Sequence, residues 1–551
     1  MRKKRILFCG EATFLNTGYA TYAREILNYL YSTGKYELAE YAAYGYDSDP
    51  RFTSPWKFFG AIPDPHNKEL TQAYKQSGKG QFGAFQFEKV CLKFLPDIVC
   101  DIRDFWMIDF VHESPFRKCF KWAIMPTVDA MPQATEWINM YNTADACFSY
   151  SDWSGDLLKQ QSGNHIKYLG SAPPSAHKAY QPIEDKQELK HRFGLDPNLK
   201  IVGTVMRNQR RKLYPDLFEA FRKFLNLVPN PSEYKLYCHT SYPDAGWNIP
   251  ELLNQHNLCS HVLFTYICQD TNMPFVSHFN GAIMQSPFTG NFSAKLANVK
   301  HGLSYEYLAQ IVNLFDIYIQ YANCEGFGLP QVEAAACGVP VMSIDYSAMS
   351  SVIKTLEGIP IPPKALYKEM ETGCYRAVPD NDKTAELLVN FFNKPEPIRK
   401  RMGFQCRENF LNHFQWHKSG AMWENYFDSV ELLPIELTWK SSVDIQEPSS
   451  FDEEMKNKTY NQIVDWLFDK VLCQPYMKYT FEYRTMISNL MYGFSTSQII
   501  GSFFNEEDSV ISLAKKIEQS QYTIESAYTA MVNKRKHINF WEQQRARVLM
   551  T

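Results

Sequence analysis

Residues 321–344, YANCEGFGLPQVEAAACGVPVMSI, combine two acidic side chains with a glycine-containing loop and the start of a helix. Glu325 and Glu333 can accept hydrogen bonds from the hydroxyl groups of a sugar or a ribose. The glycines of the loop at 325–328 allow the backbone to approach a ligand closely. A helix that begins near Pro330 presents free N–H groups and a partial positive charge, which favour a phosphate. The stretch therefore predicts a site for a phosphate-linked sugar.

The elements that position these residues follow from the same stretch. Pro330 suits the first turn of a helix, because its missing N–H needs no partner there. Residues 331–337 are mostly good helix formers, and Gly338 ends the helix. The apolar run that follows, up to Ile344, predicts a buried strand. A helix cap with two solvated glutamates is the alternative interpretation.

A second group of candidate residues is basic. Residues 200–206, KIVGTVM, predict a strand, and a helix is predicted over 214–224. Arg207 and Lys212 lie between these two elements, where cations suit a phosphate site at the carboxyl end of a strand. A solvated basic turn is the alternative.

The N-terminus predicts a similar unit. Residues 5–10, RILFCG, indicate a buried strand, and a loop ending at Gly18 leads into a helix from about Tyr19 to Leu30. Strand, glycine loop and helix form the opening of a nucleotide-binding α/β unit, although many such units bind nothing. Further strands are predicted at 96–100, 122–125, 235–240, 261–266 and 316–321.

Length and composition indicate a globular enzyme of two to four domains. The chain has 551 residues, 45% hydrophobic residues and a net charge of -3, so the overall charge does not point to nucleic acid. The N-terminus lacks the long apolar core of a secretory signal, and no run approaches 18 apolar residues. The 13 cysteines form no CxxC pair and are expected to be reduced thiols of a cytoplasmic protein.

Taken together, these patterns resemble the group 1 glycosyltransferases, a retaining family with the GT-B fold. Residues 325–341 match the family signature EGFGLPxxEAxACGxPV and keep its two glutamates. Arg207 and Lys212 keep the family's spacing between an arginine and a lysine. The resemblance covers roughly residues 1–432 and implies an α/β protein with two facing Rossmann-like domains and a cleft between them.

The resemblance also implies domain boundaries. Residues 1–185 are expected to form an acceptor-side domain, closed by a helix at about 415–432, and residues 186–414 a nucleotide-sugar-binding domain. Residues 435–551 lie beyond the resemblance and predict a mainly helical extension with a basic end. That end is either a solvated helix face or a module for oligomerisation or acceptor recruitment.

Each candidate residue has an expected role within this resemblance. Arg207 and Lys212 are expected to bind the donor diphosphate and to neutralise the leaving group. Glu325 is expected to bind donor-sugar hydroxyls, and Glu333 the ribose. Further donor contacts are expected from Gly18, Gly326, Phe327, Gly328 and Leu329.

The chain departs from the family at two places. Many relatives carry a histidine after the strand that corresponds to 122–125, and Asp129 stands there instead. This carboxylate could hold an acceptor hydroxyl, stabilise positive charge on the sugar ring, or cap the loop; His112 with Glu113 is an alternative. Beyond the motif, relatives have a glycine pair and a glutamate where this chain reads DYSAMSS at 345–351.

The sequence thus predicts a retaining glycosyltransferase that uses a nucleoside-diphosphate sugar, expected to be UDP-linked. The acceptor hydroxyl belongs to a glycan, a small molecule or modified DNA, and the oligomeric state is not indicated. No metal or other cofactor is expected, because two side-chain cations take its place, and the DxD triplet at 47–49 lies in a polar turn. Three alternatives stay open: a glycosyltransferase acting on modified bases in DNA, a sugar-nucleotide epimerase of the same fold, and an inactive sugar-nucleotide-binding scaffold.

Overall fold

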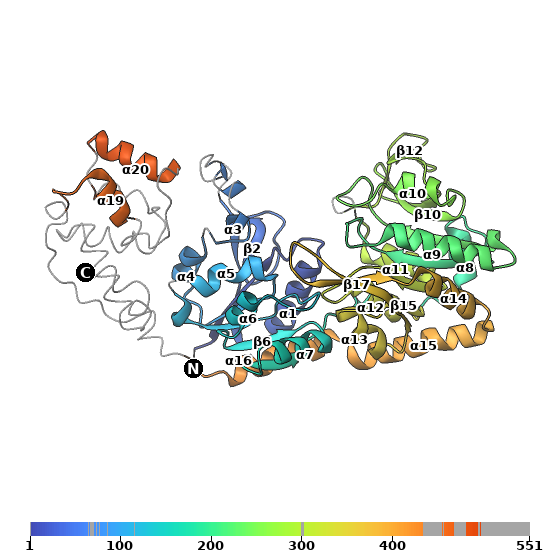
Figure 1. The fold of residues 1–551 in the computed structure, drawn as a ribbon, viewed down its shortest axis with the longest axis horizontal. Coiled ribbons are helices and arrows are strands. Elements are labelled where there is room, and N and C mark those ends of the chain that lie inside the picture. Colours follow the sequence, from blue (N-terminus) through green and yellow to red (C-terminus); the bar gives the residue numbers. More distant parts are fainter. Residues whose placement is uncertain are drawn as a thin grey trace. The chain divides into compact units, whose positions relative to one another are not determined.

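The computed structural model forms two compact units (Figure 1). The first contains the described parts of 1–15, 30–124 and 427–551, and the second contains those of 16–29 and 125–426. The structure describes residues 2–63, 66, 71–72, 74–75, 78–84, 86–114, 116–298, 302–432, 455, 457–467, 481–493 and 496.

The first unit is built on a parallel sheet. Its central strand β1 (Lys4–Glu11) pairs with β2 (Tyr36–Tyr46) on one side and with β4 (Ile98–Asp101) on the other. The sheet continues from β2 to β3 (Lys57–Ile62) and from β4 to β5 (Lys121–Ile124). β1 is buried almost throughout, as its apolar run predicts for a parallel strand covered on both faces.

Helices lie between these strands along the chain, and residues 16–29, which include most of the first helix, belong to the second unit. The helices of this part of the chain are α1 (Gly18–Thr33), α3 (Gly78–Gln81), α4 (Phe87–Phe94), α5 (Phe105–Glu113) and the 3₁₀ helix Arg117–Cys119.

Residues after 426 return to the first unit and are fastened to its N-terminal segments. The Nζ atom of Lys4 donates hydrogen bonds to the carbonyl oxygens of Phe427 (2.5 Å) and Val430 (3.1 Å). Asp428 accepts hydrogen bonds from Lys35 (2.6 Å) and from the Tyr36 hydroxyl (2.5 Å). Residues 427–430, at the end of the helix Trp416–Ser429, are therefore part of the packing of this unit.

The second unit contains a larger sheet with the strand order β12-β13-β10-β9-β8-β14-β15-β16, with β11 also paired to β10. Its parallel strands are β8 (Lys200–Val205), β9 (Tyr234–His239), β10 (Val262–Cys268), β14 (Ile317–Gln320), β15 (Val341–Ile344) and β16 (Ile359–Ile361). The antiparallel edge strands are β11 (Pro274–Ser277), β12 (Ile283–Met284) and β13 (Ala294–Leu296). These edge strands lie within residues 274–296, between β10 and α11.

Two smaller pairings complete the second unit: a parallel pair, β6 (Ala146–Ser149) with β7 (Tyr168–Ser171), and an antiparallel hairpin, β17 (Pro363–Lys368) with β18 (Tyr375–Pro379). Its helices are α6 (Thr135–Tyr141), α7 (Asp152–Gln161), α8 (Lys186–Arg192), α9 (Tyr214–Leu227), α10 (Ile249–Gln255), α11 (Tyr305–Asn313), α12 (Leu329–Ala336), α13 (Ala348–Thr355), α14 (Asn381–Phe392), α15 (Glu396–His413) and most of α16 (Trp416–Ser429).

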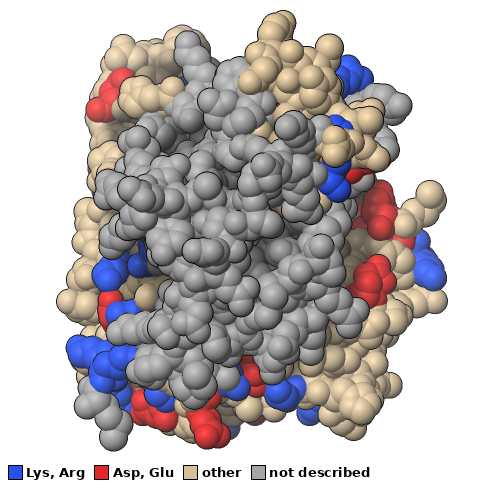
Figure 2. All heavy atoms as spheres, turned by 90° about the vertical axis from the view of Figure 1, so that its left-hand side faces the viewer, with Lys and Arg blue, Asp and Glu red and all other residues tan. Residues whose placement is uncertain are grey.

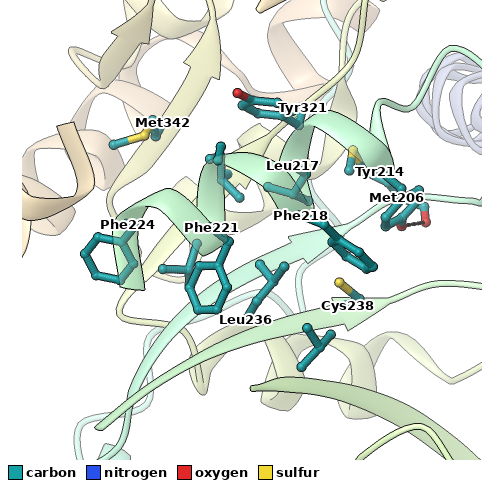
Figure 3. Packing of buried hydrophobic residues seen from close by; sticks show 14 of the residues in the cluster. Met206, Tyr214, Leu217, Phe218, Phe221, Phe224, Leu236, Cys238, Tyr321 and Met342 are labelled. Carbon is teal, nitrogen blue, oxygen red and sulfur yellow. Dashed lines mark hydrogen bonds between the residues drawn. The ribbon is translucent and has the colours of Figure 1, made fainter. Parts of the chain in front are cut away.

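The core of the second unit lies where α9 covers the sheet. Figure 3 shows Leu217, Phe218 and Phe221 of α9 near Leu236 and Cys238 of β9, and all five are buried. The apolar positions of α9 recur at helical spacing, so one face of the helix is buried. This packing fixes the strand-to-helix connection on which Arg207 and Lys212 lie.

The helical extension predicted at 435–551 is described only in part. It contains α19 (Tyr460–Trp466) and α20 (Phe481–Met491), and the Tyr483 hydroxyl donates a 2.7 Å hydrogen bond to Asp465. The helix predicted at 509–547 and the basic end lie outside the described residues. The domain boundaries near 185 and 414 stay predictions.

Several chain-wide expectations can be compared with the described residues. Within them, no helix is both long and apolar enough to span a membrane. The cysteines in the described part of the chain are free thiols, and all except Cys259 are buried. On the face shown in Figure 2, the described Lys and Arg side chains are interspersed with Asp and Glu.

Helix α15 supports the motif helix α12 through a close approach of backbone. A Cβ atom on Gly403 would lie only 2.1 Å from the carbonyl oxygen of Gly338, the residue that follows α12. Any side chain at 403 therefore pushes α15 away from the turn between α12 and β15.

We expect Gly403→Ala to destabilise the protein by about 1–3 kcal/mol, the usual range for overpacking, although alanine is the better helix former. Thermal unfolding measures this change. Gly302→Ala is the matched control, because its Cβ would approach no atom closer than 3.7 Å. A Gly403→Ala protein as stable as the control would contradict the close approach.

Candidate functional site

Two loops that are distant in sequence are joined by backbone hydrogen bonds beside β8 and β14. The amide of Leu213 donates to the carbonyl of Tyr321 (3.1 Å), and the amide of Asn323 donates to the carbonyl of Arg211 (2.9 Å). Lys212 and Ala322, which lie between these two hydrogen bonds, form an isolated antiparallel β-bridge. The basic loop and the glutamate loop are thereby held at the same end of the sheet.

This arrangement places Lys212 and Glu325 in a buried ion pair. The Nζ atom of Lys212 contacts Oε1 of Glu325, and the two residues are 8% and 7% exposed. Gln320 donates a 3.0 Å hydrogen bond to the same oxygen, and Arg211 lies 3.7 Å from the other. Burial lowers the pKa of Lys212 well below its ordinary value, with the nearby charge of Arg211 acting in the same direction.

Arg207 has different surroundings from Lys212. Its side chain is 48% exposed and forms a two-point ion pair with Asp244, with both N–O distances at 2.9 Å. Asp244 also accepts hydrogen bonds from the Ser241 hydroxyl and the Ala245 amide. Burial raises the pKa of Asp244, but these bonds outweigh it and lower the pKa to about 2. Arg207 is thus held by a carboxylate and still reaches the surface of its unit.

The basic loop is fixed by hydrogen bonds from two residues that the sequence did not single out. The buried Asn208 donates to the carbonyl of Trp247 and accepts from its amide, both at 2.8 Å. The indole N–H of Trp247 donates to the carbonyl of Lys212 at 2.8 Å. Lone Asn and Trp residues carry no sequence pattern, so only the fold reveals that they fix Lys212.

The motif loop makes a close approach to the segment that follows β5. A Cβ atom on Gly326 would lie 2.4 Å from Cγ2 of Thr127, so only glycine fits there. The Thr127 hydroxyl shares a 2.6 Å hydrogen bond with the hydroxyl of Tyr19. Gly18 begins α1 beside Tyr19, and a Cβ atom on it would meet nothing within 4 Å. The structure therefore links the Gly18 loop to Gly326 through Thr127.

The rest of the motif loop prepares the start of α12. Gly328 has a φ of +89°, a conformation that glycine adopts readily, and it precedes the first helical residue, Leu329. The ring of Phe327 is buried and packs edge-on against Phe414, with ring centres 5.8 Å apart. Phe327 can therefore offer a ligand its backbone, while its side chain supports the loop.

Glu333 lies on α12 and is buried, as is Glu325. Burial raises the pKa of Glu333 to about 7, and the nearby Tyr180 hydroxyl opposes that rise only in part. The interpretation of the two glutamates as solvated residues of a helix cap is therefore wrong.

Asp129 faces the residue before Glu325. Its Oδ2 atom accepts a hydrogen bond from the Cys324 thiol at 3.2 Å and lies 3.0 Å from a guanidinium nitrogen of Arg376. Arg376 also donates hydrogen bonds of 3.0 and 2.6 Å to Glu369. The structure thus brings Asp129 together with the motif loop, through an arginine that the sequence did not single out.

The second departure from the family places a serine against Glu325. The Ser347 hydroxyl accepts from the Glu325 amide (3.1 Å) and donates to the Glu325 carbonyl (3.2 Å). Ser347 has a φ of 55°, which costs a residue with a side chain on the order of 1–3 kcal/mol. The two hydrogen bonds explain why this conformation persists and why the loop stays fixed without a glycine pair.

The remaining candidates, His112 and the DxD triplet at 47–49, make contacts that support the fold. His112 lies on α5 in the first unit, its ring stacked on Trp122 with 6.3 Å between centres. Asp47 accepts a hydrogen bond from the Gly60 amide, and Asp49 pairs with Arg51. Across the residues that the structure describes, no group of three or more His, Cys, Asp or Glu side chains could hold a metal ion.

Comparison with known proteins agrees with the geometry of the motif. The family model described as glycosyl transferases group 1 matches residues 295–388, which contain Glu325, Glu333 and Ser347. This part of the chain is similar to that family. Sucrose synthase 2 of Oryza sativa subsp. japonica is 30% identical over 102 residues, which are 18% of this chain and 10% of that protein. Sucrose synthase 2 of Zea mays is 23% identical over 239 residues, 42% of this chain and 24% of that one. The chain thus spans between 10% and 24% of the length of these two curated relatives.

Solved structures of low sequence identity share the fold. Sucrose-phosphate synthase from Thermosynechococcus elongatus superposes with a TM-score of 0.57 at 17% identity, covering 78% of this chain and 98% of that chain. Anabaena HepE, solved in complex with UDP and glucose, gives a TM-score of 0.53 at 12% identity, covering 78% and 100%. The predicted α/β GT-B fold class is confirmed.

We expect Gly326→Ala to destabilise the protein by about 1–3 kcal/mol, the usual range for overpacking, because its methyl group would displace the motif loop from Thr127. Thermal unfolding measures this change. Thr127→Ser removes Cγ2 but keeps the hydroxyl that bonds Tyr19, so the double variant Gly326→Ala/Thr127→Ser should recover much of the loss. Equal stabilities of the single and double variants would contradict this steric explanation.

Proposed function

We propose that this protein transfers a sugar, with retention of anomeric configuration, from a UDP-linked donor to a hydroxyl acceptor. The buried ion pair of Lys212 and Glu325 is the observation that carries the proposal. This ion pair joins Lys212, the cation that the family uses to bind the diphosphate, to Glu325, the carboxylate that the family uses to bind the sugar. The HepE complex with UDP and glucose supports a UDP-linked donor for this fold.

Lys212 can serve the phosphate and the carboxylate together. An ammonium group has three N–H donors, and Glu325 takes one of them, which leaves donors for the diphosphate. Because Lys212 is buried, its attraction to a phosphate is screened less than it would be in water. Arg207 adds a planar guanidinium, held by Asp244, from the more exposed end of the same loop.

These cations act on the bond that breaks. The acceptor oxygen attacks the anomeric carbon from the face that the diphosphate leaves, and the sugar–phosphate bond breaks. Negative charge grows on the departing phosphate, where Arg207, Lys212 and the N-terminus of α12 stabilise it. The acceptor proton passes to the departing phosphate oxygen. In this proposal the side-chain cations supply the charge stabilisation, so no metal ion is required.

The two motif glutamates bind opposite ends of the donor. Glu325 accepts hydrogen bonds from the sugar hydroxyls, and its backbone is fixed by Ser347. Glu333 accepts hydrogen bonds from the ribose, for which the carboxylate form is the better acceptor. Asp129 holds the hydroxyl of the acceptor through its Oδ1 atom, since Oδ2 is already bonded to Cys324 and Arg376.

We expect Arg207→Ala and Lys212→Ala each to lower turnover of UDP-glucose by about 10²–10³-fold, as for the loss of one electrostatic stabiliser. The assay measures UDP release with water or an added sugar as acceptor. Arg210→Ala is the matched control, because Arg210 is an exposed residue of the same loop. Near-normal release by both variants would refute the assignment, and a new sugar nucleotide without UDP release would indicate an epimerase.

The affinity for UDP-glucose should rise with pH and level off above about pH 7. The pKa of Glu333 in the free protein is about 7, well above its unfolded value. The contribution of the protonated Glu333 side chain to folding stability is therefore fully present below pH 4.5 and is lost as the pH rises through 7. Ribose hydroxyls that bond the carboxylate favour its ionised form, so binding below pH 7 releases a proton and weakens by up to about tenfold per pH unit.

Calorimetry of UDP-glucose binding in buffers of different ionisation enthalpy measures this proton release. The diphosphate of UDP-glucose has no terminal phosphate that titrates in this range, so the donor does not obscure the effect. Glu333→Gln should bind more weakly and with no pH dependence between pH 5.5 and 8. The same pH dependence in that variant would show that another group titrates.

A further inference from the structure

Arg376 reaches the site from the hairpin of β17 and β18. The amide of Tyr375 donates to the carbonyl of Met131 at 2.7 Å, and the amide of Ala377 donates to the carbonyl of Asn323 at 2.9 Å. The residues on both sides of Arg376 are thus bonded to two different loops. One loop carries Asp129, and the other carries Glu325.

The side chain of Arg376 is 8% exposed and uses its nitrogens on groups of this site. One terminal nitrogen lies 3.0 Å from Oδ2 of Asp129 and 2.8 Å from Sγ of Cys324. Nε and the other terminal nitrogen donate to one oxygen of Glu369, at 3.0 and 2.6 Å. Burial lowers the pKa of Arg376, but these partners outweigh it and raise the pKa above its ordinary value. The guanidinium is therefore charged and held at a fixed angle.

These contacts determine how Asp129 can serve a ligand. Its Oδ2 atom is bonded twice, and its side chain is 36% exposed. A carboxylate held by one oxygen keeps a single rotamer and offers its other oxygen, Oδ1, to a hydroxyl group. An aspartate without such a partner would sample several rotamers, and misplacement by about 1 Å can cost about 10²-fold in rate.

We infer that Arg376 is a positioning residue, which orients the Asp129 carboxylate so that Oδ1 holds the reacting acceptor hydroxyl. This inference rests on the proposed function. It identifies the β17–β18 hairpin as part of the catalytic apparatus, although none of the residues proposed to bind the donor lies on the hairpin. In this chain the pair of Asp129 and Arg376 stands where the family has one histidine.

A double-mutant cycle separates positioning from a purely structural role. We expect Arg376→Met to lower turnover of UDP-glucose by about 10–100-fold while the affinity for UDP-glucose changes less than twofold. When Arg376→Met is added to Asp129→Asn, turnover should fall by less than a further twofold, because the carboxylate that Arg376 orients is already gone. Arg376→Lys should restore part of the activity, since lysine keeps the charge but lacks the planar fork.

Arg222→Met is the control, because Arg222 is likewise held by hydrogen bonds, in its case to two backbone carbonyls of the second unit, but lies outside the site. It should leave turnover unchanged. An equal loss from Arg376→Met in both backgrounds would overturn the inference, and so would near-normal turnover of Arg376→Met itself.

The wild type, the Arg376→Met and Asp129→Asn variants and the double variant are also compared by thermal unfolding, a measurement that does not require the protein to be active. If Arg376 holds Asp129, the destabilisation of the double variant is smaller than the sum of the two single variants. Additive destabilisation would overturn the inference even if the wild type is active. Failure of the wild type to release UDP would refute the proposed function instead, while the unfolding data still decide whether the two residues are coupled.

Discussion

The ion pair between Lys212 and Glu325 is the interaction on which the rest of the site depends. Transferring two charges from water into a protein is expensive, and the pair survives only if further contacts satisfy it. Gln320 bonds the carboxylate, Ser347 fixes its backbone, and the bridge at Lys212 and Ala322 holds the two loops together. An apolar pair of similar volume often stabilises a fold as well, which agrees with the chemical role proposed for these two charges.

The sequence was sufficient wherever a local pattern determines structure. Pro330 and Gly338 delimit α12 at nearly the predicted positions, and Ser151 caps α7 by accepting the Ser154 amide, as its residue type favours. The succession of apolar strands and amphipathic helices indicated α/β units, and the resemblance to the family implied two of them. In each case the information lies within a few residues of the element that it specifies.

What the sequence could not supply are contacts made across long separations. Asp244 and Trp247 hold the basic loop from the connection between β9 and α10, and nothing in their neighbourhood marks them for that task. Arg376 lies 247 positions after Asp129, on a hairpin that a single sequence shows only as polar residues with scattered aromatics. The sequence also could not show whether the two motif glutamates are buried or exposed, because burial depends on what the fold places around them.

The first unit is assembled from separated parts of the chain. Lys4, Lys35 and Tyr36 complete their hydrogen bonds on residues 427–430, about four hundred positions later. During synthesis on the ribosome, the N-terminal sheet therefore emerges well before the segment that fastens it. The nascent chain must therefore carry its first sheet without these hydrogen bonds until residues 427–430 have been made.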